Sequence, residues 1–99
     1  MQFFVVFTPK KRFATEGVPA DFPELEIQEQ AQVRTLYSNG SLRQVWALPP
    51  RGRGGVVLFE ADSAEHLERI IHTFPLIKAD YADYQVWDLA PYPAFMAVP

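Results

Sequence analysis

The order of strand-like and helix-like segments constrains the fold of this chain more than any other feature of its sequence. Stretches rich in aromatic and β-branched residues alternate with stretches whose apolar residues recur at helical spacing. From the N-terminus the order is strand, helix, strand, strand, helix, strand. The predicted strands cover Gln2 to Thr8, Leu42 to Leu48, Val56 to Ala61 and Asp83 to Leu89, and the predicted helices cover Asp21 to Asn39 and Ser63 to Phe74.

This βαββαβ order predicts an α+β fold of the ferredoxin-like type, in which one four-stranded antiparallel sheet carries two helices on a single face. A chain of 99 residues builds one modest core, so we expect a single domain over residues 1–99. The first strand is apolar on both sides, because Phe3 and Val5 alternate with Phe4 and Val6. Helices cover only one side of the sheet. A second chain should therefore cover the other side, and a dimer is the minimum assembly.

The first predicted helix contains a charged residue on its apolar side. Asp21 is placed to cap the N-terminus of this helix. At about 100° per residue, Glu29 falls in the middle of an apolar stripe. The stripe consists of Phe22, Leu25, Val33 and Leu36. A carboxylate there is costly unless it is paired, protonated or open to a cavity. We expect Glu29 to be a general base with a raised pKa, one half of a buried ion pair with Arg43 as the candidate partner, or a contact within an oligomer.

Composition excludes several classes of function. The chain has no cysteine, which excludes disulfide scaffolds, thiolate zinc sites and cysteine nucleophiles. A net charge of -3 gives no reason to expect nucleic acid or an anionic membrane as a partner. The apolar run from Phe3 to Phe7 is too short for a signal peptide or a membrane span, so we expect a cytoplasmic protein. His66 and His72 lie about 120° apart on their helix, and no metal site is predicted.

Proton transfer by a carboxylate, histidine or tyrosine, with arginine stabilising charge, is the chemistry that the remaining residues support. The candidates are Glu29, Arg43, Tyr81 and Tyr84. For the two tyrosines a packing or interface role remains open, and for Arg43 a structural role. The segment from Pro49 to Gly55 is rich in glycine and arginine, but it joins two strands and lacks the ending of a phosphate-binding loop. We predict a flexible hairpin there.

Several motifs in this chain resemble those of a known family. They are Glu29 on the first helix, the run from Gly40 to Trp46, Phe74-Pro75-Leu76, and Pro91 beyond it. Together they resemble the muconolactone delta-isomerase family, small ferredoxin-like oligomers of aromatic catabolism, over nearly the whole chain. Two places differ from the family: Ala47 stands where an arginine is usual, and Ile-Lys-Ala-Asp follows Leu76 in place of a Phe-Pro-Tyr-Met type of segment. Both differences are expected to touch the pocket.

The resemblance implies a cofactor-independent isomerase that shifts a proton and a double bond in a small lactone-like carbonyl compound. It needs a base, a cation near the carbonyl oxygen and a dry pocket. Glu29 and Arg43 are then the candidate catalytic residues. The candidate substrate-binding residues are Trp46, Leu76, Tyr81 and Tyr84, with no cofactor and no metal. The implied assembly is a homo-oligomer, from a dimeric α+β barrel up to a decamer.

Two other functions remain open on the same scaffold: a cofactor-free oxygenase of an aromatic polyketide, and a non-catalytic protein that binds a small ligand or serves assembly. One structural expectation accompanies all three. Trp46 should be mostly buried, so that Trp46→Ala costs about 3–5 kcal/mol of stability. Trp46 and Arg43 are three residues apart on a strand, so their side chains leave opposite faces unless the strand is bulged.

Overall fold

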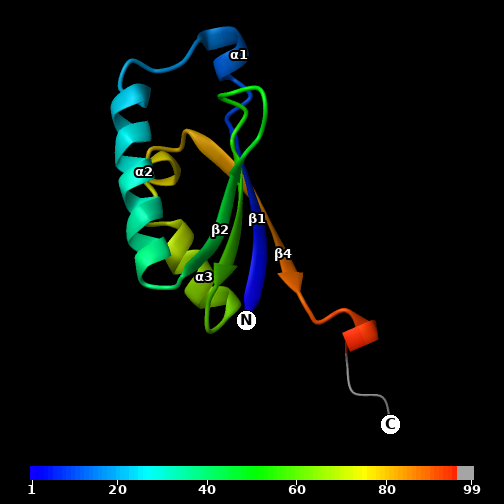
Figure 1. Cartoon of the computed structure of the whole chain (residues 1–99). Coiled ribbons are helices and arrows are strands. Elements are labelled where there is room, and N and C mark those ends of the chain that lie inside the picture. The colour runs from blue at the N-terminus through cyan, green and yellow to red at the C-terminus, as the bar shows by residue number, and fades with distance from the viewer. Residues whose placement is uncertain (96–99) are drawn as a thin grey trace.

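The computed structural model describes residues 1–95 and contains one four-stranded antiparallel sheet with its helices on one side (Figure 1). The strands are ordered β2-β3-β1-β4 across the sheet. This order and the sequence of elements confirm the predicted ferredoxin-like α+β fold. In chain order the elements are β1 (Gln2–Pro9), α1 (Phe13–Glu16), α2 (Phe22–Ser38), β2 (Leu42–Ala47), β3 (Gly55–Glu60), α3 (Ala64–Ile71), α4 (Pro75–Lys78), β4 (Ala82–Leu89) and a 3₁₀ helix at Pro93–Phe95.

The hydrophobic core lies between the sheet and the helices, and it is concentrated around α3. Phe3 and Val5 on β1 are fully buried, as are Leu67 and Ile71 on α3 to within about one per cent. On α2, by contrast, Leu36 near the C-terminal end is the one buried residue. The N-terminal half of α2 therefore does not pack closely on the sheet, and the space it leaves is the cavity described below.

The N-terminus of α2 differs from the expected capping pattern. The Asp21 side chain does not cap α2; its Oδ1 instead accepts a hydrogen bond from the Tyr81 hydroxyl at 2.7 Å. At α3 the Ser63 Oγ accepts a hydrogen bond from the His66 N–H, which is the usual N-cap contact.

Within the described part of the chain, every helix is too short or too polar for a membrane span.

A β-bulge at Arg43 decides which side chains of β2 face the helices. Leu42 pairs with Phe59 and Gln44 pairs with Leu58, so that Arg43 is the extra residue between two adjacent partners on β3. An inserted residue exchanges the faces of all the side chains that follow it. Leu42 and Val45 consequently both lie on the helix side, three residues apart, where a regular strand would place them on opposite sides.

Trp46 lies on the sheet side away from the helices. It pairs with Val56, and its ring centroid is 6.2 Å from that of Phe4 on the same side. The side chain is 46% exposed in the single chain. The expectation that Trp46 is mostly buried is therefore wrong for the single chain, because the bulge places this residue away from the core.

The helices that pack on the sheet lie on one side of it (Figure 1). The strand register places a group of apolar side chains on the other side. We call it the open face. Its central members are Phe4, Val6, Trp46, Val56, Leu58 and Trp87. Trp87 is 48% exposed, much like Trp46. Such a surface is unusual for a monomer and typical of an interface. The association of chains through this face stays a prediction.

The core itself should be sensitive to truncation. We expect Phe59→Ala to lower the free energy of unfolding by about 3–5 kcal/mol, because this ring is fully buried and leaves a cavity. Ile27 on α2 is 67% exposed, and Ile27→Ala should change stability by less than about 0.5 kcal/mol. Chemical denaturation of both variants measures the difference. Equal losses would contradict the placement of the core at β3 and α3.

Candidate active site

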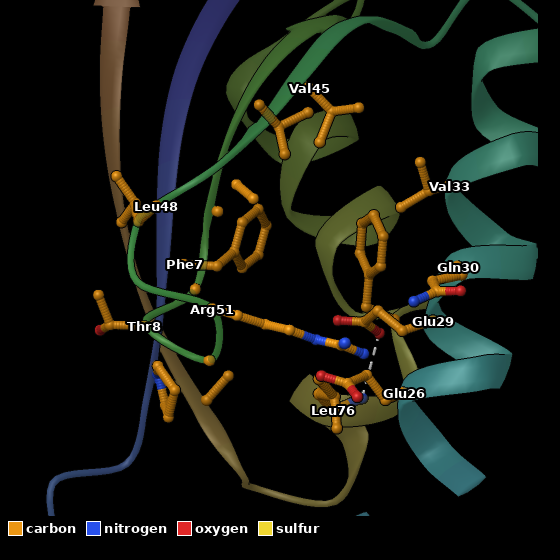
Figure 2. Close-up of a pocket in the computed structure, with 18 of the residues that line it drawn as sticks. Phe7, Thr8, Glu26, Glu29, Gln30, Val33, Val45, Leu48, Arg51 and Leu76 are labelled. Carbon is orange, nitrogen blue, oxygen red and sulfur yellow. Dashed lines mark hydrogen bonds between the residues drawn. The ribbon is translucent and has the colours of Figure 1, made fainter. Parts of the chain in front are cut away.

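A cavity of about 760 Å³ lies between the N-terminal half of α2 and the sheet (Figure 2). Phe22, Glu29 and Val33 line it from α2, and Phe7, Val45 and Val57 line it from the sheet. Leu76 of α4 and Tyr81 also line it, and Arg51 extends into it from the β2–β3 loop. The volume falls in the range of small-molecule sites, and the walls are mainly apolar with a few charged groups.

The Glu29 carboxylate points into this cavity (Figure 2). Its Oε1 accepts a hydrogen bond from the Leu76 backbone N–H at 3.3 Å. Burial raises the pKa of Glu29 to about 7; the Leu76 hydrogen bond opposes this rise, and the nearby charge of Glu26 adds to it. Glu29 forms no ion pair with any residue from 1 to 95. The alternative of a buried ion pair with Arg43 is therefore wrong for the single chain.

Arg43 and Tyr84 do not line the cavity. Arg43 is the exposed bulge residue of β2 and makes no hydrogen bond or ion pair with another described residue. The Tyr84 ring packs against Phe7, and its hydroxyl donates a hydrogen bond to the Glu68 carboxylate on α3. That hydrogen bond raises the pKa of Tyr84 to about 12. Both residues were candidates for the site, and in the single chain both lie outside it.

Of the other three candidates, Leu76 and Tyr81 line the cavity, whereas Trp46 borders it from β2 with its ring on the open face beside Phe4. Leu76 also orients the Glu29 carboxylate, through the backbone N–H that donates to it. The Tyr81 ring stacks on Phe22, with centroids 6.1 Å apart and planes at 16°. Its hydroxyl donates to Asp21, which raises the pKa of Tyr81. Tyr81 is thus a wall of the cavity whose hydroxyl already has a partner.

The β2–β3 loop is the part of the site that sequence reasoning missed. It was predicted to be a flexible hairpin, yet Arg51 extends from it into the cavity toward Glu26 and Glu29 (Figure 2). Gly54 fixes the loop against β1: its φ is +106°, and a Cβ there would lie 1.9 Å from the Phe7 carbonyl oxygen. Only glycine fits such a position. Gly54 was the one sequence signal that this loop has a fixed conformation. A glycine alone, however, does not indicate which part of the protein the loop contacts.

Of the two places where the sequence differs from the family motifs, only one lines the cavity. Ala47 lines the cavity, as expected, and its small side chain leaves room in the wall formed by β2. Residues 77–80 do not line it, because the chain turns away from the cavity between Leu76 and Tyr81. The difference that reaches the pocket is therefore the one on β2.

The arrangement can remove a proton from a small ligand. A carboxylate with a pKa near neutrality, held by one backbone N–H, faces a mainly apolar cavity. General bases work best when their pKa lies near the working pH.

No group of three or more His, Cys, Asp or Glu side chains able to hold a metal ion occurs in residues 1–95.

Comparison with known proteins places the chain in a family. The family model for muconolactone delta-isomerase matches residues 1–94. A crystal structure of muconolactone isomerase superposes with a TM-score of 0.78 at 24% sequence identity, covering 100% of this chain and 98% of that chain. The 5-chloro-2-hydroxyhydroquinone dehydrochlorinase of Burkholderia phenoliruptrix, in complex with 2,5-dihydroxybenzoquinone, superposes with a TM-score of 0.71 at 13% identity, covering 91% of this chain and 94% of that chain. Curated proteins give no significant match. The chain belongs to the muconolactone delta-isomerase family.

Proposed function

We propose that the protein is a cofactor-independent isomerase that moves a proton, and with it a double bond, in a small unsaturated lactone-like carbonyl compound. The observation that carries this proposal is the Glu29 carboxylate, which lies in an apolar cavity with a pKa of about 7. The family to which the chain belongs is named for a reaction of this type. Its link to aromatic catabolism makes lactones formed by ring cleavage the first substrates to test.

The reaction has two proton transfers. In a lactone whose double bond lies between the β and γ carbons, ionised Glu29 removes a proton from the carbon next to the carbonyl, and the electrons of the broken C–H bond move to the carbonyl oxygen to give a dienolate. The resulting Glu29 carboxylic acid then returns the proton to the γ carbon of the same dienolate. Electron density flows back from oxygen, the carbonyl reforms and the double bond has moved. Atoms and charge balance without an oxidant or a reductant.

The cavity supports each transfer. Apolar walls such as Phe7 and Val33 keep bulk water from protonating the dienolate. The Leu76 N–H holds one carboxylate oxygen of Glu29, which leaves the other oxygen to exchange the proton. A base with a pKa near 7 gives up the proton again about as readily as it accepts it, which a reversible shift requires.

The pH dependence of the rate follows from this pKa. Because the ionised form of Glu29 is the active base, kcat/KM should rise about tenfold per pH unit below pH 7 and level off above pH 8. A profile of the initial rate from pH 5 to pH 9 measures this. A flat profile, or a rate that falls as the pH rises through 7, would contradict the assignment of Glu29 as the base.

Turnover tests separate this function from its competitors. A set of small unsaturated γ-lactones is incubated with the protein in D₂O, and NMR follows the double bond and any deuterium gained. Isomerisation with no loss of dissolved oxygen supports the proposal, and most of the product should carry hydrogen at the γ carbon, because Glu29 returns the proton that it removed. Oxygen consumption would indicate an oxygenase, and a rise in Tm without turnover would indicate a binding protein. The dehydrochlorinase with the same fold makes chlorinated hydroquinones a further set, read out by chloride release.

A further inference from the structure

We propose that Arg51 is a catalytic residue: its guanidinium binds the carbonyl oxygen of the substrate and stabilises the negative charge that forms there when Glu29 removes the proton. This inference rests on the proposed function. It assigns a role to the β2–β3 loop, from which the Arg51 side chain extends into the cavity on the side opposite α2 (Figure 2).

The Arg51 guanidinium has free hydrogen-bonding capacity. It carries five N–H donors in a planar fork, a geometry suited to an oxygen that bears negative charge. Among residues 1–95 it forms no hydrogen bond and no ion pair. Its head nevertheless points at the two carboxylates of Glu26 and Glu29 (Figure 2). A cation that approaches a base without closing an ion pair leaves a space between the two, and that space is where a small ligand contacts both.

The other arginines near the site do not have this arrangement. Arg34 lies on the same helix as Glu29 and also borders a separate surface depression with Thr35 and Asn39, so it sits at the margin of the cavity. Arg43 lies outside the cavity on the β2 bulge. Arg51 alone of these three comes from the wall that faces Glu29.

The loop is built to hold Arg51 near this place. Gly54 packs its backbone against the Phe7 carbonyl, in a conformation that no side chain tolerates. The Leu48 N–H also donates a hydrogen bond to the Gly54 carbonyl at 2.9 Å across the base of the loop. Both contacts fix the ends of the loop, and Arg51 lies between them. A charged donor placed beforehand where charge develops contributes more to catalysis than one that must be reordered.

The chemistry that Arg51 adds is electrostatic. While Glu29 takes the proton, the C–H electron pair moves through the new C=C bond to the carbonyl oxygen, which becomes an enolate oxygen. Two N–H groups of Arg51 donate hydrogen bonds to this oxygen, and no covalent bond to the arginine forms. When Glu29 returns the proton to the γ carbon, the oxygen reverts to a neutral carbonyl and the product is released.

Kinetics of three variants test the assignment on any lactone that the parent isomerises. Arg51→Gln should lower kcat by roughly 10²-fold, the usual loss when one donor to a developing oxyanion is removed. KM should change little, because the neutral carbonyl of the bound substrate needs the cation less than the enolate does. Arg51→Lys should recover part of the loss. Arg53 is on the same loop, exposed and outside the cavity, so Arg53→Gln is the matched control and should match the parent.

A binding measurement gives a readout that needs no turnover. Tetronic acid, a small lactone that exists as an enolate in neutral solution, mimics the charged intermediate. Its dissociation constant should rise about tenfold or more in Arg51→Gln and stay unchanged in Arg53→Gln, because a charge-assisted hydrogen bond is lost only in the first. Isothermal titration calorimetry compares the three proteins at equal pH and salt.

The outcomes separate this inference from the function on which it rests. If Arg51→Gln keeps the kcat of the parent and its affinity for tetronic acid while Glu29→Gln is inactive, the role of Arg51 is overturned and the isomerase remains. If the loss in Arg51→Gln lies in KM alone, Arg51 binds the ground state and the catalytic role is likewise overturned. If Glu29→Gln is as active as the parent, the proposed function fails whatever Arg51 does.

Discussion

Glu29→Gln is expected to lose activity by a factor of roughly 10² or more while keeping its fold, because the substitution removes the general base and little else. The amide has almost the volume of the carboxyl group. Its oxygen can still accept the hydrogen bond that the Leu76 N–H donates to Glu29 at 3.3 Å. The shape of the cavity should therefore persist, so a loss of turnover reports on proton transfer.

The same variant should be more stable than the parent, by an amount that grows from about pH 4.5 and is fully developed above pH 7. The pKa of Glu29 is about 7 in the folded protein against an ordinary value of 4.5, so the folded state binds more protons than the unfolded state between these values. Stability contributed by the protonated carboxyl is consequently lost as pH rises from about 4.5 through 7. Because the group is partly exposed, we expect a loss of at most about 3 kcal/mol. Glutamine does not titrate, so the variant does not lose this stability as the pH rises.

Chemical denaturation at pH 4 and pH 8 measures this difference. Glu29→Gln and the parent should unfold at similar denaturant concentrations at pH 4, and the variant should unfold later at pH 8. Glu24 is exposed on the same helix and outside the cavity, which makes Glu24→Gln the matched control, with a small difference at both pH values. If Glu29→Gln unfolds much earlier than the parent at both pH values, Glu29 is structural and the assignment as base has to be abandoned.

Glu29 could be predicted from the sequence because helical periodicity alone fixes which residues share a side of a helix. Glu29 follows Phe22 by seven residues and precedes Val33 by four, and all three line the cavity. The same reasoning fails where the strand is irregular. Nothing local marks the bulge at Arg43, which depends on how β2 pairs with β3, and one inserted residue was enough to move Trp46 to the open face.

Arg51 could not be assigned for a related reason. The conformation of the β2–β3 loop follows from its contact with β1, where Gly54 meets Phe7, two positions nearly fifty residues apart in the sequence. For Tyr84 the secondary structure could be predicted but the side-chain partner could not. Its position on β4 was predicted correctly, but its hydroxyl binds Glu68 on α3, a pairing that depends on how two elements pack. Tertiary contacts decided these side chains, and periodicity carries no information about them.

We propose that the protein is at least a dimer in solution, with the open face buried between chains. This face offers aromatic and aliphatic side chains from every strand of the sheet, and Trp46 and Trp87 are each nearly half exposed. Tryptophan is enriched among the residues that dominate interface energies. Residues 90–95 after β4 extend away from the sheet (Figure 1).

Light scattering at micromolar concentration should give a mass of at least twice the 11.3 kDa of one chain. Trp87→Asp should shift this mass toward 11.3 kDa, because an unpaired carboxylate at the centre of an interface is costly to desolvate. Ile27 is 67% exposed on α2, on the opposite side of the sheet, so Ile27→Asp is the control and should keep the parent mass. A parent that scatters as 11.3 kDa would rule out the dimer.

The same assembly would account for Trp46. Removing a ring that is 46% exposed in one chain should cost the isolated fold much less than the 3–5 kcal/mol typical of a buried aromatic residue. If the open face is an interface, the larger part of the cost appears as weaker association. The unfolding midpoint of Trp46→Ala should then fall further below that of the parent as the protein is diluted, since association stabilises the folded state by mass action. A difference between the two proteins that does not change with dilution would place Trp46 outside any interface.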